Sequence, residues 1–175
     1  MLTLHGAGGS GRRGLRRLQP LADAAGLILL APDSRGTTWD VVKTGAFGPD
    51  PEFIDRGLDL VFARYAVNPS RLVAEGFSDG ASYALSLGLL NGDLFTHVIA
   101  FSPGFLAEGS RRGKPRLFVS HGLHDQVLPI ELCSRRIVRD LRGDGYDVRF
   151  TEFDGGHAVP ADIAGAAMDW LAGRG

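Results

Sequence analysis

The chain has 175 residues, of which 44% are hydrophobic and 22% are charged, and its formal net charge is −1. This composition is typical of one folded domain over residues 1–175 and excludes a disordered or repetitive protein. Acidic and basic residues are interspersed, which excludes the electrostatic footprint of a nucleic-acid or membrane-binding protein. No stretch is long and apolar enough to span a bilayer, and no signal sequence follows Met1, so we expect a cytoplasmic protein.

Glycines dominate the first loop. The apolar run Leu2 to Leu4 leads into His5 to Gly11, where four glycines let backbone N–H groups turn inward. The loop has neither a Gly-Lys-Ser/Thr ending nor a complete Gly-x-Gly-x-x-Gly, which disfavours a nucleotide site. An oxyanion loop fits better, with the N–H of Ala7 as one of two donors to a developing negative charge.

A helix, a strand and a long loop follow. Leucines and alanines recur at helical spacing over Arg13 to Ala25, and Leu27 to Ala31 is a continuous apolar run of the kind found in parallel sheets. The segment Pro32 to about Pro51 is irregular, and long loops in compact domains tend to be functional. Trp39 and Phe47 could line a substrate pocket there, although a tryptophan in a loop can equally pin that loop onto the core.

The next stretch reads as a nucleophile elbow. A helix over Phe53 to Tyr65 and a short apolar run over Arg71 to Ala74 precede Gly76 to Gly80, which has the pattern Gly-x-Ser-x-Gly and turns directly into a helical pattern. Ser78 could merely cap that helix, but the flanking glycines would then be unexplained. As an elbow, the turn presents Ser78 as nucleophile, and the N–H of Asp79 becomes the second oxyanion donor.

Strands and helices alternate through the rest of the chain. This alternation predicts an α/β fold, a mostly parallel sheet of about six strands with helices on both faces and a ligand site at the carboxyl ends of the strands. The loop from Ser102 to about Pro115 is too short to form a cap domain. The remaining strands are expected at His97–Phe101, Leu117–Ser120 and Val148–Phe153, and the remaining helices at Ile130–Leu141 and Pro160–Leu171.

Three polar residues fall in loops directly after strands. Ser78, Asp125 and His157 stand in the chain order nucleophile, acid, histidine that is expected of an α/β-hydrolase triad. His157 would remove the Ser78 proton during attack on an ester carbonyl, and Asp125 would hold the imidazole in the correct tautomer. Asp154 is an alternative acid, although it lies very near His157 in sequence.

Four further residues need an interpretation. His121-x-x-His124 invites a zinc site, but no further ligand cluster accompanies it, so we expect no metal or cofactor, and His121 is expected to shape its loop. Glu75 beside the elbow must be either paired with another group or solvated, because an isolated carboxylate is costly to bury. Cys133 is the only cysteine, which excludes an internal disulfide, and its helical context indicates packing.

Six blocks carry a family resemblance over nearly the whole chain: Leu4-His5-Gly6-Ala7-Gly8, Thr38-Trp39-Asp40, Asn68-Pro69-Ser70-Arg71, Gly76-Phe77-Ser78-Asp79-Gly80, His121-Gly122-Leu123-His124-Asp125-Gln126-Val127-Leu128-Pro129 and Gly156-His157. In these blocks the chain resembles the phospholipase/carboxylesterase family of α/β hydrolases, which includes acyl-protein thioesterases and small carboxylesterases. The resemblance implies an α/β-hydrolase fold, the Ser78, Asp125 and His157 triad, Ala7 in the first oxyanion position and Trp39 lining an acyl pocket.

One departure from the family concerns the start of the sheet. Family members carry strands before the His-Gly strand, whereas Met1 here begins inside that strand. The apolar run Leu27 to Ala31 would then be an exposed sheet edge, and such edges tend to pair. We therefore expect either a homodimer through this edge or a start codon placed too late.

The function expected from the sequence is hydrolysis of small, short-chain carboxylic esters. Gly-x-Ser-x-Gly does not encode the leaving group, so a thioesterase, a lysophospholipase and a polyester or feruloyl esterase are alternatives. A non-catalytic binding protein is the alternative from another class, since a loosened Ala7 loop would spoil the oxyanion hole.

Overall fold

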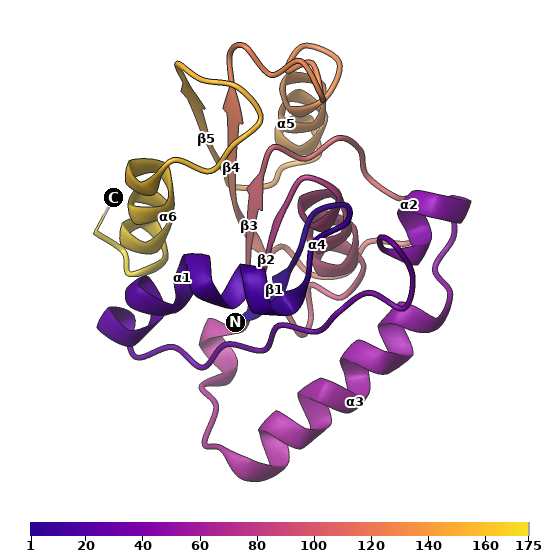
Figure 1. The fold of residues 1–175 in the computed structure, drawn as a ribbon, viewed down its shortest axis with the longest axis vertical. Helices are drawn as coiled ribbons and strands as arrows, with labels where there is room; N and C mark the ends of the chain where they lie inside the picture. The colour runs from indigo at the N-terminus through magenta and orange to yellow at the C-terminus, as the bar shows by residue number, and fades with distance from the viewer. Residues whose placement is uncertain (175) are drawn as a thin grey trace.

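A parallel sheet organises the molecule. The computed structural model describes residues 1–174. Its sheet has five strands in the order β1-β2-β3-β4-β5, and every neighbouring pair is parallel (Figure 1). The strands are β1 (Leu2–Leu4), β2 (Val73–Phe77), β3 (His97–Phe101), β4 (Arg116–Gly122) and β5 (Val148–Phe153). The predicted α/β architecture is confirmed, with one strand fewer than expected.

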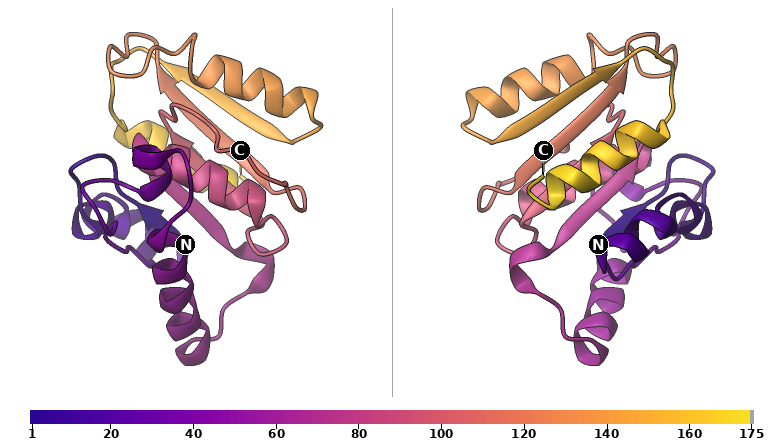
Figure 2. Two further views of the ribbon diagram at one scale, coloured as in Figure 1. Left: turned by 90° about the vertical axis from the view of Figure 1, so that its right-hand side faces the viewer. Right: turned by 90° about the vertical axis from the view of Figure 1, so that its left-hand side faces the viewer.

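Helices cover both faces of the sheet. Helices α1 (Gly11–Ala25) and α6 (Ala161–Leu171) pack on one face, and α3 (Pro49–Arg64), α4 (Asp79–Leu90) and α5 (Ser134–Gly143) lie on the other (Figure 2). Two apolar clusters result because strands that are covered on both sides bury side chains in both directions. The sheet is therefore the middle layer of three, and its loops at the carboxyl ends of the strands are free to form a site.

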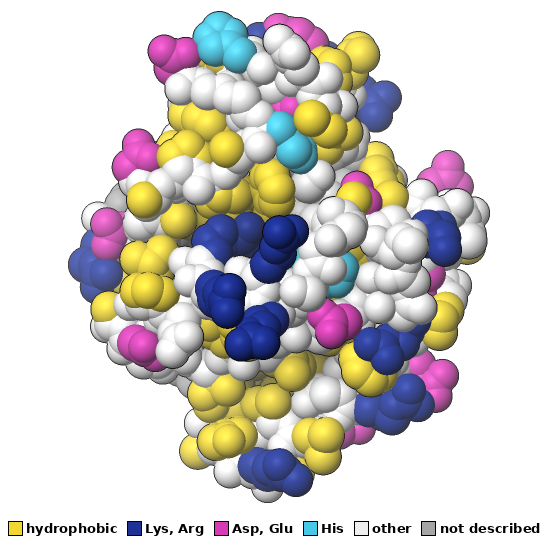
Figure 3. Space-filling view, in the orientation of Figure 1, with side chains coloured by type: hydrophobic (Ala, Val, Ile, Leu, Met, Phe, Trp, Pro, Cys, Tyr) yellow, Lys and Arg dark blue, Asp and Glu magenta, His cyan; other side chains and the backbone are white. Residues whose placement is uncertain are grey.

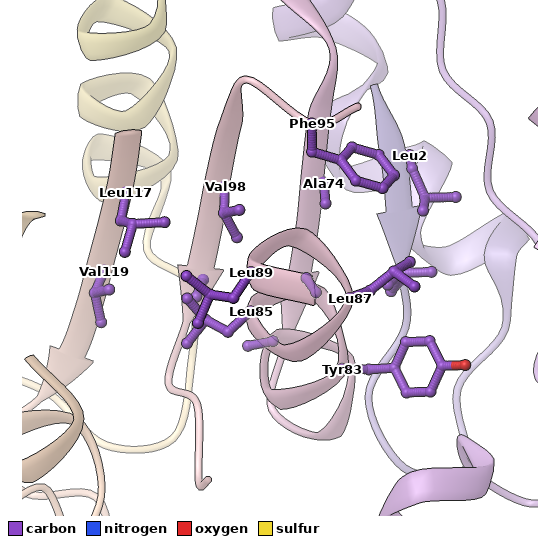
Figure 4. Close-up of a cluster of buried hydrophobic side chains, with 14 of the residues drawn as sticks. Leu2, Ala74, Tyr83, Leu85, Leu87, Leu89, Phe95, Val98, Leu117 and Val119 are labelled. Atoms are coloured by element: carbon purple, nitrogen blue, oxygen red, sulfur yellow. The ribbon is translucent and has the colours of Figure 1, made fainter. Parts of the chain in front are cut away.

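Helix α4 is the central element of the larger cluster. Ten of its residues are buried, as expected of a helix that is apolar almost all round. Figure 4 shows Leu85, Leu87 and Leu89 directed from this helix toward the sheet and its neighbours. Burying a leucine contributes about 1.5 to 3 kcal/mol. This packing fixes α4, and with it the turn that carries Ser78.

The expected strand at Leu27–Ala31 is wrong. Only Leu30 pairs with the sheet, through an isolated bridge to Leu2, where its N–H donates to Met1 O and its C=O accepts from Thr3 N–H. The N-terminal amino group of Met1 also donates to Ile28 O at 2.7 Å, but the surrounding residues form no ladder, and Ile28 stays 39% exposed. An apolar run alone does not make a strand, because a strand also needs a partner along its whole length.

Other boundaries moved by a few residues. Helix α3 begins at Pro49 rather than Phe53, and α5 begins at Ser134 rather than Ile130. The expected irregular loop contains a short helix, α2 (Asp40–Thr44). Arg71 belongs to a 3₁₀ turn, so β2 starts later than expected. Among residues 1–174, no helix has both the length and the apolar character needed to cross a membrane.

Candidate active site

Ser78 lies on a strained turn between β2 and α4. Its φ is +59° and its ψ is −120°, a backbone conformation that non-glycine residues rarely adopt and that costs on the order of 1 to 3 kcal/mol. The turn is held from both sides, because Ser78 N–H donates to Phe101 O and Ser78 C=O accepts from the N–H of Ala81. The geometry lifts the hydroxyl to the carboxyl end of the sheet.

His157 joins Ser78 to Asp125. Its Nε2 lies 2.8 Å from Ser78 Oγ, and its Nδ1 lies 2.7 Å from Asp125 Oδ2. Since an ionised carboxylate only accepts, Nδ1 carries the proton and Nε2 accepts from the serine hydroxyl. The Phe77 ring packs against the imidazole with 4.8 Å between ring centroids. The structure thus brings the three residues predicted from chain order into one hydrogen-bonded chain.

Three hydrogen bonds hold Asp125 in place. Its Oδ1 accepts from the N–H groups of Val127 and Leu128, each at 2.9 Å, while Oδ2 faces His157 and lies 3.1 Å from His121 Nε2. Burial alone would raise the pKa of Asp125, but the bonds from Leu128, His157 and Val127 outweigh burial and lower it. Asp125 is therefore a carboxylate that can stabilise a positive charge on His157.

The alternative acid lies elsewhere. The side chain of Asp154 is 89% exposed and pairs with His124, with 2.9 Å between Oδ1 and Nε2. This pair sits at the surface and makes no bond to His157. His124 is thus exposed whereas His121 is buried, and no group of three or more metal-ligating side chains occurs within residues 1–174.

His121 is a supporting residue whose contact with Asp125 the sequence did not reveal. Its Nε2–H donates to Leu128 O at 2.7 Å, as the predicted loop-shaping role requires, and its Nδ1 accepts from Ser134 Oγ at 2.5 Å. Burial lowers the pKa of His121, so the neutral ring is favoured. The ring is fully buried behind Asp125 and ties the carboxylate to the start of α5. The spacing of four residues between His121 and Asp125 is the sequence feature that could have indicated their contact.

The glycine loop after β1 lies beside the elbow. His5 Nε2 accepts from Ser34 N–H at 3.0 Å, and Gly8 N–H donates to Thr37 O, so the loop is tied to the segment after Leu30. No acceptor for the N–H of Ala7 occurs within residues 1–174. Asp79 is the first residue of α4, so its N–H has no partner inside the helix. Both predicted donors therefore have a free N–H group, and their oxyanion role stays a prediction.

Trp39 packs in the core beneath this loop. The side chain is fully buried, its Nε1–H donates to His5 O at 2.8 Å, and its ring lies 4.8 Å from the His5 ring and 5.0 Å from Tyr83. Phe47 is half-buried and meets Tyr83 edge-on at 5.5 Å. These contacts favour the alternative in which Trp39 pins its loop, and a substrate-lining role for Trp39 and Phe47 stays a prediction. Cys133 is buried, as expected of a packing residue.

Solved structures share the fold of nearly the whole chain. No family model matches, and no curated protein matches in sequence. Esterase PE8 is 24% identical, with a TM-score of 0.80 over 98% of this chain and 90% of that one. This chain has the α/β-hydrolase fold. Arabidopsis thaliana SOBER1 is 18% identical at a TM-score of 0.80 (99% and 97% covered), and a Dyadobacter fermentans phospholipase/carboxylesterase is 18% identical at 0.77 (98% and 88% covered).

In this α/β-hydrolase fold, Glu75 occupies the β2 strand directly below the elbow. It is fully buried, and its Oε1 accepts from Arg17 Nη2 at 2.5 Å, so the side chain is paired rather than solvated. Its Oε2 has no hydrogen-bond partner within residues 1–174. Burial raises the pKa of Glu75 to about 7, although the Arg17 guanidinium opposes the rise. Burial prevails because the Arg17 side chain is itself 25% exposed and partly solvated.

Glu75→Gln should change how stability depends on pH. The folded carboxyl keeps its proton up to about pH 7, whereas the unfolded one releases it near pH 4.3, so this group stabilises the fold at low pH and loses that contribution as pH rises to 7. Relative to the variant, the wild type should lose about 3 kcal/mol of unfolding free energy between these limits. Urea unfolding at several pH values measures this difference.

Glu52→Gln is the matched control. Glu52 is 74% exposed and pairs with Arg56 on the surface of α3. Its replacement should leave a nearly constant difference from the wild type over the same pH range. A Glu75→Gln difference as flat as that of the control would contradict a raised pKa at Glu75.

Proposed function

We propose that the protein is a serine hydrolase that cleaves short-chain carboxylic esters. The observation that carries the proposal is the continuous chain from Ser78 Oγ through His157 to Asp125, with contacts of 2.8 and 2.7 Å. Nucleophile, base and orienting acid within such distances form the arrangement that activates a serine for acyl transfer. The fold shared with esterase PE8 supports the same reaction class.

The reaction proceeds through an acyl-enzyme. His157 Nε2 takes the proton from Ser78 Oγ as the oxygen attacks the ester carbonyl, and the N–H groups of Ala7 and Asp79 hold the oxyanion. Collapse breaks the bond to the alcohol, which leaves with the proton from His157. Water then attacks the acyl group in the same way, with His157 again as base, and releases the acid.

A second candidate function is the hydrolysis of long-chain esters or of thioesters. The segment that carries Asp125 exposes three apolar side chains, Leu123 (42%), Val127 (65%) and Leu132 (69%). A long acyl chain could cover these side chains and gain about 0.8 kcal/mol for each buried methylene. Lysophospholipase or thioesterase activity is therefore the alternative within the same fold.

Hydrolysis of a p-nitrophenyl ester series from acetate to palmitate tests the proposal. We expect kcat/KM to peak at the short esters, since the structure has only the segment between β3 and β4 in place of a cap domain. Highest activity on the long-chain esters would favour the second candidate. A thiol-release assay on matched thioesters then distinguishes thioesterase from lysophospholipase activity. Turnover no higher than that of Ser78→Ala would contradict a hydrolase and favour a non-catalytic binding protein.

A further inference from the structure

The first two turns of α1 carry a cluster of arginines. Arg12, Arg13 and Arg16 are exposed and have no acidic partner within residues 1–174; together they are called the α1 arginine patch. Figure 3 shows Lys and Arg side chains gathered at the middle of the face over which Figure 1 places α1. A local concentration of positive charge is unexpected in a chain whose net charge is −1.

Several other arginines of the chain pair with a neighbouring carboxylate. Arg135 in α5 pairs with Glu131 and Glu152, and the fourth arginine at the start of α1, Arg17, pairs with Glu75. Arg64 and Arg136 likewise make no ion pair within residues 1–174, so the α1 arginine patch is distinguished by the gathering of three such arginines at positions 12–16 of one helix.

The patch is unfavourable for the helix that carries it. Arg12 and Arg16 stand four residues apart, as do Arg13 and Arg17, and like charges at this spacing destabilise a helix by about 0.2 to 0.5 kcal/mol per pair. The first turn itself contains no acidic residue, and the positive charges there oppose the helix dipole, although the Asp33 carboxylate accepts from Gly11 N–H at 2.7 Å from outside the helix. Asp33 and Glu75 offset part of this cost, but Arg12, Arg13 and Arg16 keep no acidic partner within residues 1–174, and a local conflict of this kind is typical of a functional surface.

The patch lies at the same end of the sheet as the candidate active site. Helix α1 begins at the carboxyl end of β1, the end of the sheet that also carries Ser78, so its first turns are the ones nearest the site. Arg17 extends this contact inward: its guanidinium lies 5.9 Å from the Phe77 ring, and the Phe77 ring packs on His157 at 4.8 Å. One aromatic ring thus lies between Arg17, in the second turn of α1, and the imidazole of His157.

We propose that the α1 arginine patch binds an anionic group, best a phosphate, that the ester substrate carries away from its scissile bond. Guanidinium groups bind phosphate and carboxylate oxygens through two parallel hydrogen bonds, and phosphate offers more acceptors and charge. The patch spans about 6 Å of helix, which suits one such group rather than a polyanion. This proposal names the substrate class of the proposed function and rests on it.

A pair of acetate esters that differ in charge tests the proposal. The probes are para-acetoxyphenyl phosphate and the neutral methyl para-acetoxybenzoate, with para-acetoxybenzoate as the carboxylate arm. In the variant Arg12→Gln/Arg13→Gln/Arg16→Gln, the ratio of kcat/KM for the phosphate ester to that for the neutral ester should fall about tenfold or more. A smaller fall with the carboxylate arm identifies phosphate as the preferred group, and a larger one overturns that preference.

Exposed arginines on other helices provide a matched control. The variant Arg64→Gln/Arg136→Gln/Arg139→Gln removes the same number of positive charges from α3 and α5. Its ratio should equal that of the wild type. An equal fall in both variants would mean that only net charge matters, and an unchanged ratio in the α1 variant would likewise overturn the proposal.

A binding measurement separates this proposal from the proposed function. Calorimetric titration of para-acetoxyphenyl phosphate into Ser78→Ala requires no turnover. Loss of affinity when the α1 arginine patch is also replaced supports the anion site even if the wild type hydrolyses nothing. Equal affinity with and without the patch overturns the site even if the wild type is an active esterase.

Discussion

Ser78→Ala is expected to lower kcat/KM for p-nitrophenyl acetate by about 10⁴ to 10⁶. The variant should keep the fold, because the one hydrogen bond of Ser78 Oγ within residues 1–174 is to His157 Nε2, and the backbone bonds of the turn do not involve the hydroxyl. The reaction loses its nucleophile, and His157 and the oxyanion donors are left to assist water. A melting temperature close to that of the wild type would show that the variant is folded and that the fall in kcat/KM reflects the lost nucleophile.

His157→Ala should lower the same rate by a similar factor, and the double variant should be no slower than either single one. The reason is that base and nucleophile act as one unit through their 2.8 Å contact, so removing either disables the other. Multiplicative losses in the double variant, or a His157→Ala rate close to that of the wild type, would show that His157 is not the base for Ser78.

The parallel sheet is what made the candidate site predictable from sequence. Ser78, Asp125 and His157 lie far apart in the chain, but each follows a strand, and the carboxyl ends of parallel strands meet at one edge. The order of strands and loops was therefore enough to place three side chains together. The same reasoning failed for Leu27–Ala31, where the apolar pattern was present but only Leu30 found a partner.

Contacts between side chains could not be predicted in this way. His121 reaches Asp125 and Ser134 only because the loop after β4 folds back onto the start of α5. The pairing of Glu75 with Arg17 joins residues of β2 and α1 that no local pattern relates. Periodicity fixes which face a residue takes within its own element, whereas such contacts depend on how the elements pack.

Replacing either glycine of the elbow is expected to cause the largest loss of stability. A Cβ on Gly76 would lie 2.1 Å from Gly80 O, and a Cβ on Gly80 would lie 2.2 Å from Leu4 O. These are backbone atoms of β1 and α4, which are fixed by the sheet and by the packing of α4. We expect Gly76→Ala and Gly80→Ala each to cost more than about 4 kcal/mol. For a domain of this size the melting temperature should fall by more than about 10 °C, or the variant should be insoluble.

Gly165→Ala in α6 separates this effect from a general cost of replacing glycine. A Cβ there would meet no atom within 4 Å, and alanine favours a helix over glycine by up to about 1 kcal/mol, so its melting temperature should equal or exceed that of the wild type. Elbow variants as stable as Gly165→Ala would contradict the close approach of β1, β2 and α4. Since the oxygen of His5 lies 2.6 Å from the position of a Gly80 Cβ, any Gly80→Ala protein that still folds must displace the loop that carries Ala7. It should therefore lose ester hydrolysis as well as stability.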